Sequence, residues 1–179
     1  MNGQAMSSPT VASTVALAGA GDEAAFARLV ATYNADMARV AFVACGDREL
    51  AEDAVQSAWL IAWRKLRSLR DPDRVRPWLL SVTANETRQL LRRQRGAVVE
   101  IDVEAPGDAR GDPSTRIERL DLRRALAHLS PDDRALLAMR YVVDLSSDEL
   151  ATAVGTSPST ARTRLSRVID RLRKELRDG

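Results

Sequence analysis

The stretch that decides the fold lies at residues 146–172 and has the sequence SSDELATAVGTSPSTARTRLSRVIDRL. A short helix is predicted to start near Ser146, and Gly155 allows a tight turn after it. Ser157 and Pro158 then begin a longer helix, because serine caps helix N-termini and proline suits the first helical position. Short helix, turn and longer helix follow in the order of a helix-turn-helix motif.

The longer helix, expected from Pro158 to about Arg177, has two different sides. At about 100° per residue, one side is apolar and consists of Ala161, Leu165, Val168, Ile169 and Leu172. The opposite side carries hydroxyl and guanidinium groups from Ser159, Thr163, Ser166 and Arg167, flanked by Thr160 and Arg162. Such groups bond base edges and phosphates in the DNA major groove. The pattern predicts a DNA-recognition helix, and the alternative is an ordinary helical hairpin with a polar surface.

Two further helices precede this motif in what we expect to be a small second domain, residues 116–179. One is predicted from about Arg116 to Leu129, and the next starts at Ser130-Pro131-Asp132-Asp133, which has the pattern of a capping box with proline at the first helical position. Residues 97–115 differ, because they are acidic and contain proline and glycine. We expect them to form a flexible linker, with Glu100, Asp102, Glu104, Asp108 and Asp112 as its acidic groups.

A first domain is predicted at residues 22–96 as three helices. Asp22 is the expected cap of the first helix, the second starts near Asp47, and Pro77 opens the third. No segment has a convincing strand pattern. We therefore expect an all-α protein of two small helical domains joined by the acidic linker, with residues 1–21 as a flexible tail.

Basic residues are concentrated in two blocks, although the net charge is only +2. One block runs from Arg64 to Arg95 and the other from Pro158 to the end. Two separated basic blocks indicate two contacts with a polyanion, usually nucleic acid. Two solvated helix faces are the alternative.

The third helix of the first domain combines an aromatic ring, amides and cations on one face: Trp78, Asn85, Arg88, Gln89 and Arg92. Aromatic stacking together with cations is typical of single-stranded DNA binding. The alternative is that Trp78 is a core residue and Asn85 a surface amide. On the second helix, Asp53, Gln56 and Leu60 share a face away from the apolar stripe. This mixed face is typical of docking onto a partner helix, and a solvated face is an equally good alternative.

Catalytic and metal-binding patterns are missing from the sequence. One cysteine, Cys45, and one histidine, His128, are too few for a disulfide within the chain or a Cys/His zinc site. No P-loop, dinucleotide fingerprint or nucleophile elbow is present. We expect a non-enzymatic protein without a cofactor. Residues 1–20 lack the basic start of a signal peptide, and no stretch could span a bilayer, so we expect a cytoplasmic protein with no membrane contact of its own.

The sequence contains the segments AEDAVQ (51–56), RPWLLSVTAN (76–85), LSPDDR (129–134) and GTSPSTARTRLSR (155–167). Together they resemble the extracytoplasmic-function sigma factors of bacterial RNA polymerase. The segment AEDAVQ (51–56), followed by Ala62-Trp63-Arg64, resembles their polymerase-docking helix. The segment RPWLLSVTAN (76–85), leading into Leu91-Arg92-Arg93, resembles their −10 recognition helix. The segments LSPDDR (129–134) and GTSPSTARTRLSR (155–167) resemble their −35 recognition domain.

The resemblance implies a subunit that binds core RNA polymerase and directs promoter-specific initiation. Polymerase binding would fall to Glu52, Asp53, Gln56 and Leu60. DNA binding would fall to Trp78, Asn85, Arg88 and Arg92 at the −10 element, and to Ser159, Thr160, Arg162, Thr163, Ser166 and Arg167 at the −35 element. The implied partners are core RNA polymerase, promoter DNA and an anti-sigma factor, and the linker would run toward the RNA exit path.

Two other functions are alternatives to this one. A helix-turn-helix regulator that binds DNA alone would explain the second domain but would not need the docking motif at residues 51–56. An enzyme with a DNA-binding tail would need a catalytic constellation, which the sequence does not show.

Overall fold

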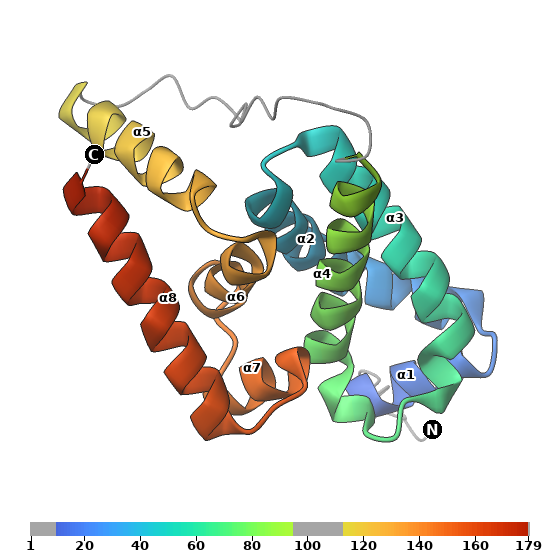
Figure 1. Ribbon diagram of the computed structural model, residues 1–179. Coiled ribbons are helices and arrows are strands. Elements are labelled where there is room, and N and C mark those ends of the chain that lie inside the picture. Colours follow the sequence, from blue (N-terminus) through green and yellow to red (C-terminus); the bar gives the residue numbers. More distant parts are fainter. Residues whose placement is uncertain (1–9, 95–112, 179) are drawn as a thin grey trace, which may run out of the picture.

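The structure is a computed structural model that describes residues 10–94 and 113–178. At residues 113–119 and 178 it describes the backbone only. Its regular elements in these ranges are all helical (Figure 1). The first domain contains α1 (Val11–Gly19), α2 (Glu23–Cys45), α3 (Arg48–Lys65), the short 3₁₀ turns η1 (Leu66–Ser68) and η2 (Pro72–Arg74), and α4 (Val75–Gln94). The second contains α5 (Pro113–Ala127), α6 (Pro131–Tyr141), α7 (Ser147–Val154) and α8 (Pro158–Asp178). The all-α prediction is confirmed for the described residues.

Side chains with hydrogen-bonding oxygens set where several helices begin. Asp22 accepts a hydrogen bond from the backbone N–H of Ala25 at 2.7 Å, and Asp47 accepts one from Leu50 at 2.9 Å. Ser146 and Glu149 form a reciprocal capping box at the start of α7. These bonds satisfy N–H groups that have no partner within the helix. The predicted cap at Asp22 is therefore confirmed.

The core of the first domain lies where α2, α3 and α4 pack together. Met37 of α2 and Leu79 of α4 are fully buried there. Thr83 and Thr87 are buried in α4 as well, and their hydroxyls donate to the carbonyls of Leu79 and Thr83, both at 2.9 Å. Because these bonds satisfy the hydroxyls, the polar groups can lie in the core.

Helix α1 corrects the prediction of a tail over residues 1–21, which is wrong for residues 11–19. Thr10 caps this helix, and Val15 and Ala18 are buried on the side that contacts α2, η1 and η2. A Cβ at Gly19 would lie only 3.1 Å from the Cα of Arg67, so the absence of a side chain allows the close approach to η1. Residues 1–9 lie outside the described residues.

Helix α6 of the second domain also packs against the first domain. Residues 133–139 are all buried, because α6 contacts α2 and α4 of the first domain and α7 and α8 of the second (Figure 1). α7 also contacts α4. The expected linker lies outside the described residues, apart from residues 113–115, which belong to α5.

Candidate functional site

The exposed side of α3 brings the sequence-predicted docking residues together. Glu52, Asp53, Gln56 and Leu60 are all exposed, whereas Val55, Ala58 and Ala62 are buried on the other side. Leu60 is 60% exposed, and Trp63, 42% exposed, lies one turn further along. The Trp63 ring meets the ring of Phe26 edge to face at 4.8 Å between centroids, which fixes its position.

The predicted DNA face of α4 is not a single open surface. Arg92 is exposed, but Trp78 is half-buried and packs against the core. Asn85 and Arg88 line a cavity of about 340 Å³ between α4, α6 and α7. Arg88 donates to Asn85 and also lies 3.2 Å from both carboxylate oxygens of Asp132. The structure therefore turns two of the four predicted residues toward the second domain.

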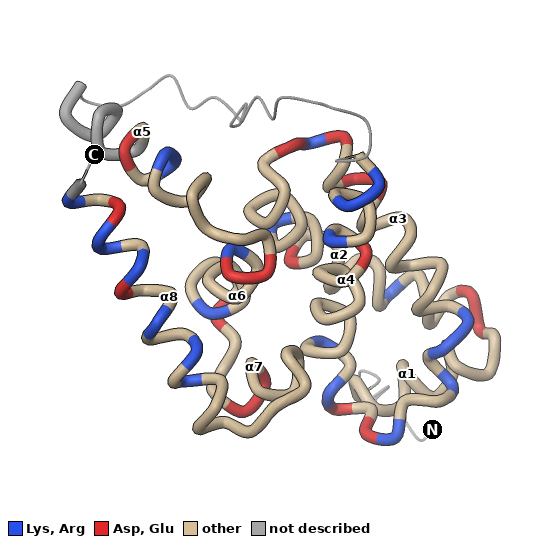
Figure 2. The backbone as a smooth tube through the Cα atoms, in the orientation of Figure 1, with Lys and Arg blue, Asp and Glu red and all other residues tan. Residues whose placement is uncertain are grey.

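The outer side of α8 is open. Its predicted DNA-binding residues, Ser159, Thr160, Arg162, Thr163, Ser166 and Arg167, are all exposed. Ala161 and Val168 are buried on the inner side, with Leu165, Ile169 and Leu172 packed partly against the core, which confirms the expected orientation of the helix. The Ser157 hydroxyl accepts a hydrogen bond from the N–H of Thr160 at 3.2 Å and so caps the helix. Basic residues recur along α8 (Figure 2).

A buried carboxylate, Asp133 of α6, binds part of the basic block of α8. Its side chain is 9% exposed and lies 2.8 Å from Arg171 and 3.5 Å from Arg164. The Ser130 hydroxyl also donates to it at 2.8 Å. Within the described residues, Arg162 and Arg167 form no recorded ion pair. Sequence reasoning had grouped these arginines together, because only the tertiary structure shows which of them face α6.

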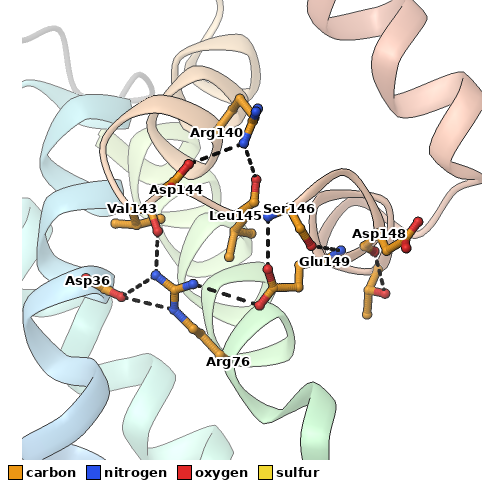
Figure 3. A network of polar contacts seen from close by, with 10 residues as sticks. Asp36, Arg76, Arg140, Val143, Asp144, Leu145, Ser146, Asp148 and Glu149 are labelled. Carbon is orange, nitrogen blue, oxygen red and sulfur yellow. Dashed lines mark hydrogen bonds and ion pairs between the residues drawn. The ribbon is translucent and has the colours of Figure 1, made fainter.

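A second network, centred on Arg76, was also missed (Figure 3). Arg76 is 28% exposed and lies 2.9 Å from Asp36 of α2 and 3.8 Å from Glu149 of α7. It also donates to the carbonyl of Val143. Burial raises the pKa of the neighbouring Tyr33, while the charge of Arg76 lowers it and that of Asp36 raises it. The sequence places these groups far apart, and no local pattern pairs them.

Surfaces, rather than clusters of reactive side chains, are the candidate sites in the part of the chain that the structure describes. No group of His, Cys, Asp and Glu within residues 10–94 and 113–178 is arranged to hold a metal ion. Cys45 is buried, its thiol donates to the carbonyl of Asp47 at 3.1 Å, and burial raises its pKa. No helix in these ranges has the length and apolar character needed to cross a bilayer.

Comparison with known proteins connects these surfaces to transcription. The family model described as Sigma-70 region 2 matches residues 29–97, and the model described as Sigma-70, region 4 matches residues 119–172. The sigma factor CarQ of Myxococcus xanthus is 34% identical over 71% of this chain and 75% of its own length. The ECF sigma factor SigL of Mycobacterium tuberculosis is 30% identical over 90% of this chain and 94% of its own length. The chain spans 42% of the probable sigma factor RfaY of Xanthomonas campestris, with 29% identity.

Among solved structures, a chain in the structure of CnrH in complex with the cytosolic domain of CnrY has a TM-score of 0.69 and 25% identity. The match covers 92% of this chain and 96% of that chain. CnrH is a sigma factor of Cupriavidus metallidurans. This chain therefore belongs to the extracytoplasmic-function sigma factors of bacterial RNA polymerase. Its function is promoter-specific initiation of transcription with core RNA polymerase and promoter DNA.

Proposed function

We propose that the exposed side of α3 docks on core RNA polymerase, through Glu52, Asp53, Gln56 and Leu60. The observation that carries this proposal is Leu60, 60% exposed on a helix whose other side is already buried. Exposed Trp63 extends the apolar area, and carboxylate and amide groups border it. An apolar centre with a polar rim is the usual composition of a protein–protein interface.

The helix α8 is the proposed reader of the −35 element. Its capped N-terminal half presents hydroxyl and guanidinium groups on the open side, and the N-terminal half of a recognition helix enters the major groove. Arg162 and Arg167 are the proposed direct DNA contacts, because neither guanidinium has a recorded carboxylate partner in the described residues. Arg164 and Arg171 are held by Asp133 and are assigned to positioning the helix.

The helix α4 is the proposed site for the opened −10 strand. Arg92 is exposed, and Asn85 and Arg88 add an amide and a cation beside the half-buried ring of Trp78. Cations and an aromatic ring together suit unpaired bases and their phosphates. In the structure, Arg88 pairs with Asp132, so DNA would have to replace this carboxylate.

The protein itself would carry out no chemical step, since the polymerase supplies catalysis, and it would act in the cytoplasm without a cofactor or membrane contact. Its likeness to CnrH, which is solved with the cytosolic domain of CnrY, supports an anti-sigma factor as a further partner. A regulator that binds DNA alone is the weaker proposal, because it leaves the exposed side of α3 without a role.

The docking proposal is tested by Asp53→Ala combined with Gln56→Ala, both exposed side chains with little part in the fold. Truncating these two polar groups beside Leu60 should weaken core-polymerase binding roughly tenfold, while the helical content and melting temperature change little. Affinity is measured by titrating labelled protein with core polymerase, and run-off transcription should fall in parallel. Glu23→Ala with Thr32→Ala, which also removes exposed polar groups, is the matched control. Equal affinity for the two double variants would contradict the assignment.

A further inference from the structure

The contacts between the two domains are concentrated on the helix proposed to bind the −10 strand. Arg74, just before α4, donates to the hydroxyl of Thr152 in α7. Arg76 reaches Val143 and Glu149, and Arg88 reaches Asp132. The cross-domain bonds thus extend from the turn before α4 to the second half of the helix.

The charges on the two sides are complementary. Asp132 in the first turn of α6 and Glu149 in the first turn of α7 pair with arginines of α4, whereas the neighbouring Asp133 pairs with arginines of α8. Acidic residues in these turns and basic residues in α4 are coloured in Figure 2. Carboxylates at Asp132 and Glu149 therefore bind cations that phosphates would otherwise bind. Asn85 and Arg88 line the cavity between the domains, and Arg88 pairs there with Asp132, so α6 competes with DNA for this cation.

Apolar packing accompanies these polar contacts. Buried residues of both domains, from Val15 to Val168, belong to one continuous hydrophobic cluster. Within it, Leu136 and Met139 of α6 are almost fully buried, and α6 contacts α2 extensively. Figure 3 shows Arg76 joining α2, α4 and the region from Val143 to Glu149 around a single guanidinium. The domains are thus held by packing, and ion pairs specify how they face each other.

We propose that the second domain docks on the −10 face of the first, and that this closed form keeps single-stranded DNA off α4 until the domains separate. The DNA part of this proposal rests on the function proposed above for α4. In the closed form, the first turns of α6 and α7 contact α4 through Asp132 and Glu149 in place of DNA. If only a fraction of the molecules is open, the apparent affinity for DNA equals the affinity of the open form multiplied by that fraction.

The test changes only the second domain, so that every proposed DNA contact on α4 stays intact. Asp132→Asn removes the charge that faces Arg88 and keeps the shape of the side chain. Glu149→Gln removes the charge that faces Arg76 and retains the capping box, since glutamine serves at that position as well. Asp144→Asn is the matched control, because Asp144 is exposed, pairs only with Arg140 of its own domain, and has a positive φ that asparagine tolerates.

Closure and DNA binding are measured separately on the full chain. Spin labels at Arg28→Cys and Lys174→Cys report the distance between the domains, and the native Cys45 is buried away from the label. Loss of two partly exposed ion pairs should increase the long-distance population on the order of fivefold. The apparent affinity for a short random-sequence single-stranded DNA should rise by the same factor, with the control unchanged.

Two results would overturn the proposal: a distance distribution equal to that of the control, or a larger open population with no gain in DNA affinity. The role of α4 in DNA binding is checked independently by Arg92→Ala, because Arg92 is exposed and lies away from the recorded cross-domain bonds. Weaker DNA binding by that variant supports the proposed function whether or not the domains close. An unchanged affinity would contradict the −10 assignment alone.

Discussion

At the scale of single residues, the arginines of α8 have different environments. Buried Asp133 binds Arg164 and Arg171, while Arg173 lies 3.5 Å from Asp170 on its own helix. Arg162 and Arg167 are exposed, and Arg167 lines the same hollow as Asp133, Arg164 and Arg171. Helical periodicity in the sequence was enough to predict which side is open. It could not predict the role of Asp133, because that depends on how α6 crosses α8.

Arg162→Ala should remove a base contact at the −35 element. Such a loss costs about 1–3 kcal/mol and relaxes the preference at one base pair. Arg173→Ala, further along the helix and paired with Asp170, should change neither affinity nor preference strongly. The measurement is transcription by holoenzyme on promoters altered singly across the −35 element. An unchanged preference profile for Arg162→Ala would mean that α8 is placed wrongly on DNA.

At the scale of elements, caps and turns made most helices predictable from the sequence. The side chains of Asp22, Ser130 and Ser146 each accept a hydrogen bond from the backbone N–H three residues later in the chain. Their positions before apolar runs predicted these caps. Helix α1 was missed, because its small apolar residues lack the polar side that marks an amphipathic helix. Its stability depends on packing against α2 and η1, which is a tertiary effect.

The turn between α7 and α8 depends on Gly155, whose φ of 67° is left-handed. Gly155→Ala should lower the free energy of unfolding by roughly 1–2 kcal/mol through backbone strain alone, because a Cβ there meets no atom within 4 Å. Gly155→Asn should cost less, since asparagine tolerates this conformation. Urea denaturation of the two variants gives the comparison. Equal losses would point to a steric cause in place of backbone strain.

At the scale of the whole molecule, the sequence predicted two domains and the class of protein but not how the domains face each other. The acidic first turns of α6 and α7 and the basic α4 are far apart in the chain. Their pairing follows from the path that α6 takes against α2. The proposed closed form also accounts for the half-buried state of Arg88, which helical periodicity alone had assigned to an open DNA face.

A shared hydrophobic cluster predicts cooperative unfolding of the two domains. The three tryptophans, Trp59, Trp63 and Trp78, all lie in the first domain, so their fluorescence reports that domain, whereas circular dichroism reports helices in both. In urea the two signals should follow one transition with the same midpoint. The Asp132→Asn, Glu149→Gln double variant should separate them. Two midpoints in the unaltered protein would show that the domains unfold independently.

The position of α6, buried on both sides, also has a consequence during synthesis. The first domain emerges from the ribosome before α6 does. The surface of α2 that α6 later covers is therefore exposed to solvent for part of translation. At about 5–20 residues per second, that interval lasts for seconds, and uncovered apolar surface is what chaperones bind. A ribosome that stalls within α6 therefore leaves a nascent chain that is exposed to aggregation, because the first bundle has emerged while α6 is still inside the ribosome.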